Sequence, residues 1–394
     1  MRFREVYLDN GATTMVDPKV AEAMRPYFTK HYGNPSSIHS FGTEARTAVE
    51  EARRVIAKSI NASPDEIIFT SGGTESNNFA LKSIAFTNKD KGNHIITTKV
   101  EHKCILKSCK WLEEQGFKIT YLDVDSEGFV NPDALEKAIT KETILFSAIH
   151  ANNEIGTIMD IEAFGKVCRK HNVYFHTDAC QSYTKTEIDV KKQNIDLMSL
   201  NAHKIHGPKG VGALFIRNGV KIKPWQHGGG QERNIRSGTE NVPGIVGFAE
   251  TVKMANKKHV EHMSRLRDKL IKGILEIPGT MLNGAKGDKR LCNNVNVCFK
   301  AIEGEAIGAL LDQKLICSST GSACSAKELE PSYVLLAIGV SHEDANGSLR
   351  LTLSRFTTEE EIDYALEVLP DVVEKLRKIS PFGKALDFIA KKIS

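Results

Sequence analysis

The sequence lacks several features that would assign it to whole classes of protein. No apolar run in its 394 residues approaches the roughly 18–20 needed to cross a bilayer, so we expect no membrane-spanning segment. Its eight cysteines include no Cys-x-x-Cys pair, which argues against both a zinc site and a disulfide framework. No basic cluster is interleaved with aromatic residues, as nucleic-acid grooves are. The sequence therefore predicts no metal, no nucleic-acid partner and no membrane partner.

Charge and targeting signals are equally uninformative about a partner. The net charge of +4 is small against 53 basic and 49 acidic residues. The polar start, Met1–Glu5, lacks the apolar segment of a signal peptide, and we find no internal repeat or low-complexity segment. We therefore expect a cytoplasmic, enzyme-sized globular protein. With 41% hydrophobic residues, the chain is long enough for a large core and a second, smaller lobe.

Strand-like runs alternate with helical patterns over the first half of the chain. A helix is predicted around 44–60, and strands are predicted at 66–70, 94–98, 118–122, 143–149, 173–176, 195–200 and 211–216. Such alternation indicates an α/β fold, in which helices flank a mostly parallel sheet. After a break near Val242–Gly244, a long helix from about Ile245 through Lys272 is expected to lead into a smaller α+β region. We predict a large domain over residues 16–258 and a small domain formed by 1–15 together with 259–394.

A lysine is presented at the end of one predicted strand. Lys204 lies between the runs 195–200 and 211–216, in the segment Asn201–Gly210. Lysine forms a Schiff base with aldehyde cofactors, and enzymes that use pyridoxal 5'-phosphate (PLP) pair it with an acid for the pyridine nitrogen and with a phosphate cradle. Both partners can be sought in the same sequence.

Both partners have candidates that follow other predicted strands. Asp178 ends the buried run Val173–Thr177 and could keep a pyridine nitrogen protonated, although an aspartate there could also cap a helix. Gly72 and Gly73, followed by Thr74, lie between a strand and an apolar helical pattern, where free N–H groups could bind phosphate or the glycines could merely turn the chain. Ligands of such sheets bind beyond the carboxyl ends of the strands, so these signals converge on one edge.

Other short motifs occur in a specific order along nearly the whole chain. They are Tyr7–Thr14, Tyr32–Ser37, Thr70–Asn78, Val100–Lys103, Asn152–Gly156, His176–Asp178, Ala202–Lys204, Arg236–Thr239 and Ser318–Cys324. Together they resemble the cysteine desulfurases of the class V, fold-type I PLP enzymes, in the branch typified by iron–sulfur cluster and nitrogenase-maturation enzymes. The resemblance implies a fold-type I transferase with a large PLP-binding domain and a smaller α+β domain.

The resemblance also implies a role for individual residues. It makes Lys204 the Schiff-base lysine and base, Asp178 the pyridinium partner, and His102 the imidazole that stacks on the cofactor and carries protons. Gln181 would contact the phenolic oxygen of the cofactor. The remaining implied cofactor contacts are Gly73, Thr74, Asn153, Asn201, His203 and Thr239. Asn201 stands where many members of the family carry serine, and its amide can still donate a hydrogen bond.

Substrate and subunit contacts follow from the same resemblance. Asn153 and Arg350 would bind the carboxylate of L-cysteine, Arg350 through its two-pronged guanidinium, and Asn34 would also lie at the substrate. Thr239 would reach the phosphate of a neighbouring subunit, which implies a homodimer. Without that context, His102 could be a capping or surface residue, and Arg350 could lie on the exposed face of an edge strand.

Cys324 is the predicted nucleophile. It lies in a run of small polar residues that is typical of an exposed loop, whereas Cys298 has core neighbours and Cys104 and Cys180 are expected to be packing residues. The resemblance implies that Cys324 takes sulfur from L-cysteine as a persulfide, leaving L-alanine, and passes it to an iron–sulfur scaffold or another acceptor, such as one for tRNA thiolation. Another PLP reaction, such as transamination or selenocysteine cleavage, and a non-enzymatic scaffold role are the alternatives.

Overall fold

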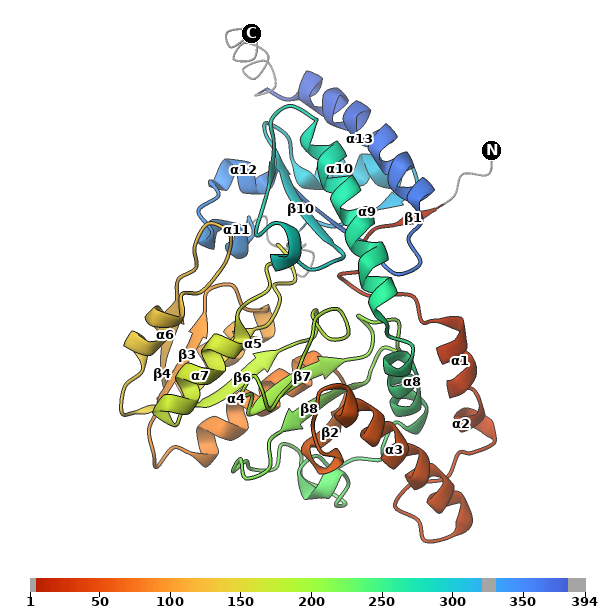
Figure 1. The fold of residues 1–394 in the computed structure, drawn as a ribbon, viewed down its shortest axis with the longest axis vertical. Helices are drawn as coiled ribbons and strands as arrows, with labels where there is room; N and C mark the ends of the chain where they lie inside the picture. Colours follow the sequence, from red (N-terminus) through yellow and green to blue (C-terminus); the bar gives the residue numbers. More distant parts are fainter. Residues whose placement is uncertain (1–4, 321–330, 382–394) are drawn as a thin grey trace.

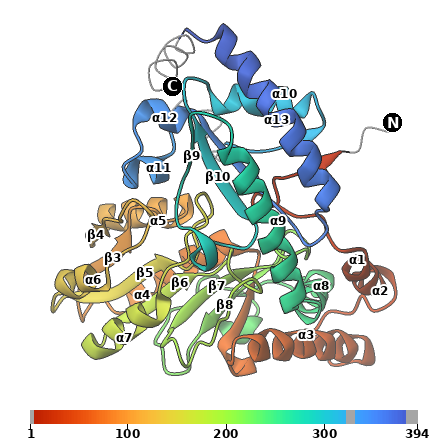
Figure 2. The same ribbon diagram turned by 45° about the horizontal axis from the view of Figure 1, so that its top comes forward.

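The computed structural model describes residues 5–320 and 331–381 (Figure 1). A large sheet with helices on both faces occupies one half of the molecule, and a smaller sheet with its own helices occupies the other. Figures 1 and 2 both show α9 (Lys257–Leu275) beginning close to α8 (Val242–Lys253) of the large unit and running along the small one.

The central sheet contains the predicted strands in the order β2-β8-β7-β6-β5-β3-β4. Its strands are β2 (Ile67–Thr70), β3 (His94–Thr98), β4 (Lys118–Leu122), β5 (Thr143–Ile149), β6 (Tyr174–Asp178), β7 (Leu197–Asn201) and β8 (Gly212–Ile216). Only β8 runs antiparallel to its neighbours, so the expectation of a mostly parallel sheet is confirmed. Parallel strands buried on both faces are rich in Val, Ile, Leu and Phe, which explains why the sequence pattern located them.

Helices bury both faces of this sheet. On one face, Phe146 of β5 stacks on Phe175 of β6, with Phe164 packed edge-on against both rings. On the other face, Phe79 of α4 and Ile105 of α5 belong to a second apolar cluster. The helices of this unit are α1 (Pro18–Met24), α2 (Pro26–Thr29), α3 (Ser40–Ser59), α4 (Gly73–Thr87), α5 (Lys103–Glu114), α6 (Pro132–Ala138), α7 (Ile161–His171) and α8.

The smaller unit has its own core. Its antiparallel sheet has the order β12-β10-β9, and the two-stranded sheet β1-β11 lies beside it. The strands are β1 (Val6–Tyr7), β9 (Thr280–Leu282), β10 (Asn294–Phe299), β11 (Ile316–Cys317) and β12 (Ser348–Thr352), and the helices are α9, α10 (Gly304–Asp312), α11 (Tyr333–Ala337), α12 (His342–Asn346) and α13 (Glu359–Ile379). Short 3₁₀ turns cover Pro64–Glu66, Glu232–Asn234 and Gly287–Lys289.

Two features differ from the expectations. The predicted helix from Ile245 through Lys272 is two helices, because the side chain of Asn256 accepts a hydrogen bond from the N–H of His259 and begins α9 as a new helix. The strand predicted at 173–176 extends to Asp178, which is the last residue of β6.

The domain boundaries stay a prediction, with which the membership of the apolar clusters can be compared. Val6 and Leu8 belong to the core of the small unit, together with residues of α9, β10 and α13. Val334 and Leu335 of α11, however, pack into the core of the large unit. The chain after residue 330 therefore contributes to both cores.

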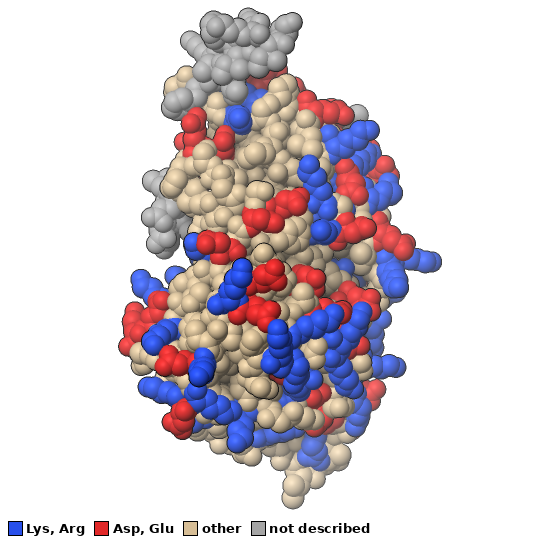
Figure 3. All heavy atoms as spheres, turned by 60° about the vertical axis from the view of Figure 1, so that its left-hand side comes forward, with Lys and Arg blue, Asp and Glu red and all other residues tan. Residues whose placement is uncertain are grey.

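Surface charge and helix length agree with the composition. Figure 3 shows Lys and Arg side chains interspersed with Asp and Glu over the face that it presents. No helix in residues 5–320 and 331–381 is long and apolar enough to span a bilayer. The same ranges contain no group of three or more His, Cys, Asp or Glu side chains arranged to hold a metal ion.

Candidate active site

One cavity of about 430 Å³ collects most of the predicted site residues, and both units contribute to its wall. The predicted residues that line it are Gly73, Thr74, His102, Asn153, Asp178, Gln181, Asn201, His203, Lys204 and Arg350. Parallel strands end on the same edge of a sheet, which brings Asp178 of β6 and Asn201 of β7 to one side of the cavity. Arg350 comes from β12 of the small unit.

The amine of Lys204 is directed at the N-terminal segment. Lys204 Nζ donates hydrogen bonds to the carbonyl oxygens of Gly11 and Ala12, the latter at 2.9 Å. Gln181 Nε2 donates to the same Gly11 oxygen at 3.0 Å. Behind the site, Lys185 Nζ donates to the carbonyl of Lys204 at 3.3 Å, and burial lowers the pKa of Lys185 to about 8. These contacts fix both the backbone and the amine of Lys204 at the cavity.

The carboxylate of Asp178 is held by two donors. The N–H of Cys180 donates to its Oδ1 at 2.9 Å, and Asn77 Nδ2 donates to its Oδ2 at 2.6 Å. Asp178 is buried, with 4% of its surface exposed. The suggestion that Asp178 only caps a helix is therefore too narrow, because the side chain also lines the cavity.

The start of α4 has the form of an anion cradle. Gly72, at φ +149°, precedes the first residue of the helix, Gly73, and a Cβ atom at Gly73 would collide with the sulfur of Cys180. The glycine therefore keeps the backbone open, and the helix N-terminus is positive. Burial, with Lys204 as a smaller contribution, lowers the pKa of the nearby His203 to about 4, so its imidazole is neutral at neutral pH.

His102 is both a helix-capping residue and a residue of the cavity wall. It is the N-cap of α5, and its Nδ1 accepts a hydrogen bond from the N–H of Cys104 at 3.2 Å. Its ring also lines the cavity. Burial lowers its pKa, opposed by the charge of Asp178, so the neutral imidazole is favoured.

Arg350 lies on an edge strand, but its side chain is only 5% exposed, so the suggestion of an exposed arginine is wrong. Its Nη1 donates to the carbonyl of Asn153 at 3.0 Å, and its Nη2 contacts Asp9 Oδ1 at 3.1 Å. Arg350 Nε and Asn153 Oδ1 are buried without a hydrogen-bond partner among the described residues. An unsatisfied buried guanidinium N–H that lines a cavity suits a carboxylate ligand.

Two predicted residues are not part of this arrangement, and a third lies outside the residues that the structure describes. Asn34 is exposed and accepts a hydrogen bond from the N–H of Ser36. Thr239 lines a separate cavity of about 150 Å³ together with Arg236. Cys324 lies outside the described residues.

The cavity also contains residues to which the sequence assigned no role. They are Gly11, Ala12, Asn77, Lys103, Cys104, Ile149, Glu154, Cys180 and Tyr333. Gly11 and Asn77 lie inside motifs that carried the family resemblance, so the motifs located them without revealing their contacts. Burial raises the pKa of Glu154 to about 7, although a hydrogen bond from Ser332 opposes the shift.

Comparison with known proteins decides the family. The model of the class-V aminotransferases matches residues 6–365. A cysteine desulfurase, IscS, of Methanosarcina thermophila is 54% identical over 381 residues, which are 96% of this chain and 94% of that protein. The chain belongs to the cysteine desulfurases of the class-V aminotransferase family. The mitochondrial cysteine desulfurase of Saccharomyces cerevisiae is 47% identical, over 96% of this chain and 77% of its own.

Solved structures agree with this assignment to the cysteine desulfurases. A NifS-like protein superposes with a TM-score of 0.89 at 41% identity, covering 95% of this chain and all of its own. A structure described as SspA in complex with cysteine has a TM-score of 0.81 at 37% identity, covering 90% of this chain and all of its own. The fold-type I architecture and the family resemblance are thus confirmed, and the family is PLP-dependent.

Proposed function

We propose that this cysteine desulfurase holds PLP in the cavity and converts L-cysteine into L-alanine, with the sulfur passing through Cys324 to an acceptor protein. The convergence of Lys204, Asp178, His102 and Arg350 on one cavity carries the proposal. A lysine, a buried carboxylate and a glycine-started helix are the groups that PLP needs, and a buried arginine suits the substrate carboxylate.

The residues of the cavity fit the cofactor. Gly73, Thr74 and His203 would hold its phosphate at the start of α4, Asp178 its ring nitrogen and Gln181 its phenolic oxygen. When bound, PLP supplies an electron sink for the substrate's α-carbon. Glycine at residue 73 is consistent with this assignment, because a Cβ atom there would collide with the sulfur of Cys180 in the wall of the cavity and force the start of α4 to shift.

The remaining groups would act on the substrate. Arg350 and Asn153 orient its carboxylate, because Arg350 Nε has an N–H to donate. Lys204 Nζ takes the proton from the substrate α-carbon. The position of Lys204 just after β7, in the wall of the cavity, supports this role. His102 holds a proton beside these groups.

The sulfur step balances with Cys324 as the acceptor. The C–S bond of L-cysteine breaks and an S–S bond forms, so L-cysteine and the Cys324 thiol yield L-alanine and a Cys324 persulfide. The thiol sulfur is oxidised while the substrate carbon gains a hydrogen in place of sulfur. The persulfide sulfur then passes to an iron–sulfur scaffold or another acceptor, such as one for tRNA thiolation.

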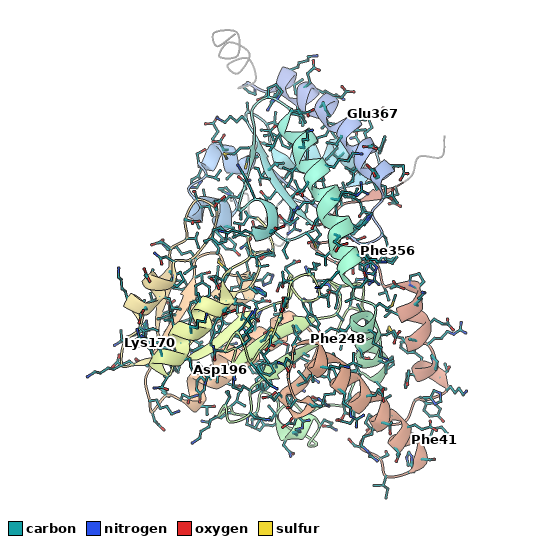
Figure 4. The ribbon with its side chains drawn as sticks, viewed as in Figure 1. Phe41, Lys170, Asp196, Phe248, Phe356 and Glu367 are labelled. Atoms are coloured by element: carbon teal, nitrogen blue, oxygen red, sulfur yellow. The ribbon has the colours of Figure 1, made fainter. Side chains whose placement is uncertain are left out.

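An exposed apolar surface supports a homodimer. Phe28, Tyr32, Ile38 and Phe41 are between 45% and 97% exposed, around the α2–α3 connection that also carries Asn34. Figure 4 shows Phe41 at an outer corner of the molecule, away from the small unit. Tyr32 and Phe41 are in ring contact, and exposed large apolar side chains gathered in this way are typical of an interface between protein chains. A second copy seated there would explain why Asn34 and Thr239 lie outside the cavity of a single chain.

The test is release of alanine and sulfide from L-cysteine by PLP-loaded protein with a reducing thiol present. We expect equal amounts of both products, none with Lys204→Ala, and no persulfide with Cys324→Ala although PLP stays bound. Cys317→Ala is the matched control, because Cys317 lies in β11, away from the cavity. 3-Mercaptopyruvate in place of alanine would indicate transamination, and alanine from selenocysteine alone would indicate a selenocysteine lyase. Bound PLP without either product would contradict the proposal.

A further inference from the structure

Cys104 and Asn77 connect two groups of the site that the proposed function uses separately. Both residues line the cavity, next to His102 and Asp178. We propose that they are positioning residues: a chain of hydrogen bonds from Asp178 through Asn77 and Cys104 ends at Nδ1 of His102 and leaves the proton of the neutral imidazole on Nε2. The meaning of this arrangement for catalysis rests on the proposed function, but the arrangement itself can be tested without it.

Asn77 takes part in two of these hydrogen bonds. Its side chain is buried on α4, and its Nδ2 lies 2.6 Å from Asp178 Oδ2 and 3.2 Å from Cys104 Sγ. The amide nitrogen must face the carboxylate, because an amide oxygen there would be repelled. One hydrogen of Nδ2 therefore serves Asp178 and the other serves Cys104. Asn77 Oδ1 makes no hydrogen bond within the described ranges, so its acceptor does not compete with this orientation.

The thiol of Cys104 donates the next hydrogen bond of this series, to His102. Burial, reinforced by Asp178, raises the pKa of Cys104 to about 12, so the thiol keeps its hydrogen at neutral pH. Its sulfur lies 3.0 Å from Nδ1 of His102. The sulfur accepts from Asn77, and the side-chain hydrogen bond with Thr74 lowers the pKa of Cys104, as a donor to the sulfur does; both contacts leave the hydrogen of the thiol for Nδ1.

The capping contact of His102 determines which nitrogen of the neutral ring carries the hydrogen. Nδ1 also accepts from the backbone N–H of Cys104 at 3.2 Å, and a backbone N–H cannot reverse its direction. Two donors at Nδ1 require the hydrogen of the neutral ring to sit on Nε2. Nε2 makes no hydrogen bond within the part of the chain that the structure describes, so it is the ring nitrogen left for a ligand. In the proposed reaction, neutral His102 then acts by donating a proton from Nε2.

The first measurement is ¹⁵N NMR of the histidine ring nitrogens in the full chain, with and without PLP, above the pH at which His102 titrates. The charged groups that act on His102 are Asp178, which favours the imidazolium, and Lys204 and Lys103, which oppose it. We expect a single neutral form with the hydrogen on Nε2. A His102 ring with its hydrogen on Nδ1, or an even mixture of forms, would overturn the proposal without any variant.

Variants test the contribution of the thiol. Cys104→Ala should move the Nδ1 resonance towards that of an acceptor without a second donor, and Cys104→Ser should restore it through the hydroxyl. Cys109→Ala is the matched control, because Cys109 is a buried thiol on the same helix that does not line the cavity. Asn77→Ala should alter the same resonance, and the double variant should show little further change, since both residues belong to one chain. An Nδ1 resonance unchanged in Cys104→Ala would refute a role for the thiol.

Measurements of catalytic activity distinguish a failure of this inference from a failure of the proposed function. Loss of one neutral hydrogen bond corresponds to about a three- to tenfold effect, so we expect the kcat of Cys104→Ala to fall by about that factor, with KM changed less than about twofold. Alanine release by a protein whose His102 carries its hydrogen on Nδ1 would sink the inference and leave the function standing. The expected ring nitrogen signals in a protein that releases no alanine would do the opposite.

Discussion

Replacement of Arg350 by lysine tests the proposed substrate contact most directly. The guanidinium donates to the carbonyl of Asn153 and to Asp9, and its Nε–H has no partner among the described residues. A substrate carboxylate could accept from Nε and from a second hydrogen of a terminal nitrogen. Lysine keeps the charge but cannot form this fork.

The size of the effect follows from the number of hydrogen bonds lost. One hydrogen bond to a charged group contributes about 1.5–3 kcal/mol, which corresponds to roughly a 10- to 150-fold change in affinity. We therefore expect Arg350→Lys to raise the KM for L-cysteine by about that factor. A single contact between the lysine ammonium and the carboxylate would place the rise in KM at the lower end of this range.

The assay is the initial rate of alanine release against L-cysteine concentration, at saturating PLP. Arg355→Lys is the matched control, because Arg355 is a buried arginine of the same unit that pairs with Asp17 at 2.5 Å and does not line the cavity. It should destabilise the fold without a comparable rise in KM. If Arg350→Lys left KM within about twofold of the wild type and changed only the melting temperature, the contact would be structural and the reasoning would fail.

Three further predictions concern the cofactor cradle and stability. Gly73→Ala should weaken PLP binding by about tenfold or more in a fluorescence titration, because the methyl group meets a cysteine sulfur, whereas Gly308→Ala, whose methyl group would make only an ordinary contact with Ser318 at 3.7 Å, should not. Burial raises the pKa of Glu101 to about 8, so the contribution of this residue to stability is present at low pH and is lost as the pH rises from about 4.5 through 8. Glu101→Gln should therefore be more stable relative to the wild type at pH 9 than at pH 5. We expect a difference of at most about 5 kcal/mol in the free energy of urea unfolding. Glu232→Gln removes the buried carboxylate partner of Arg53, leaves only the partly exposed Glu50, and should cost about 3–5 kcal/mol, whereas Glu142→Gln, which breaks an exposed pair, should cost less than about 1 kcal/mol. Equal effects of the two last changes would refute the argument from burial.

The sheet could be predicted because its signal is local. The runs at β3, β4 and β5 are rich in apolar and β-branched residues, and the expected bounds match the observed ones. The direction of β8 was not predicted, although the connection from Asn201 to Gly212 contains no helix that could make a parallel crossover. The break before α9 also had a local signal, since Asn256 is a strong N-cap residue, but the apolar pattern around it masked the cap.

The site was predictable in part, for a similar reason. Asp178 and Lys204 follow apolar strands, and strand ends in parallel sheets share one edge, so their meeting could be inferred. The contact of Lys204 Nζ with the carbonyls of Gly11 and Ala12 could not, because it joins a side chain to backbone atoms about 190 residues away. Asn77 and Asp178 likewise meet only through the packing of α4 against the sheet, which no residue pattern records.

The N-terminal segment links the two halves of the proposed reaction. Asp9 pairs with Arg350, the proposed carboxylate contact, while Gly11 and Ala12 accept hydrogen bonds from Lys204 Nζ. Arg350 and Lys204 are thus held by one stretch of four residues, which passes from the core of the small unit to the wall of the cavity. A carboxylate that binds Arg350 competes with Asp9 for the guanidinium and so acts on the segment that also holds the lysine. Substrate binding and the placement of the Lys204 amine are therefore physically coupled, and substitutions at Asp9 should change both together.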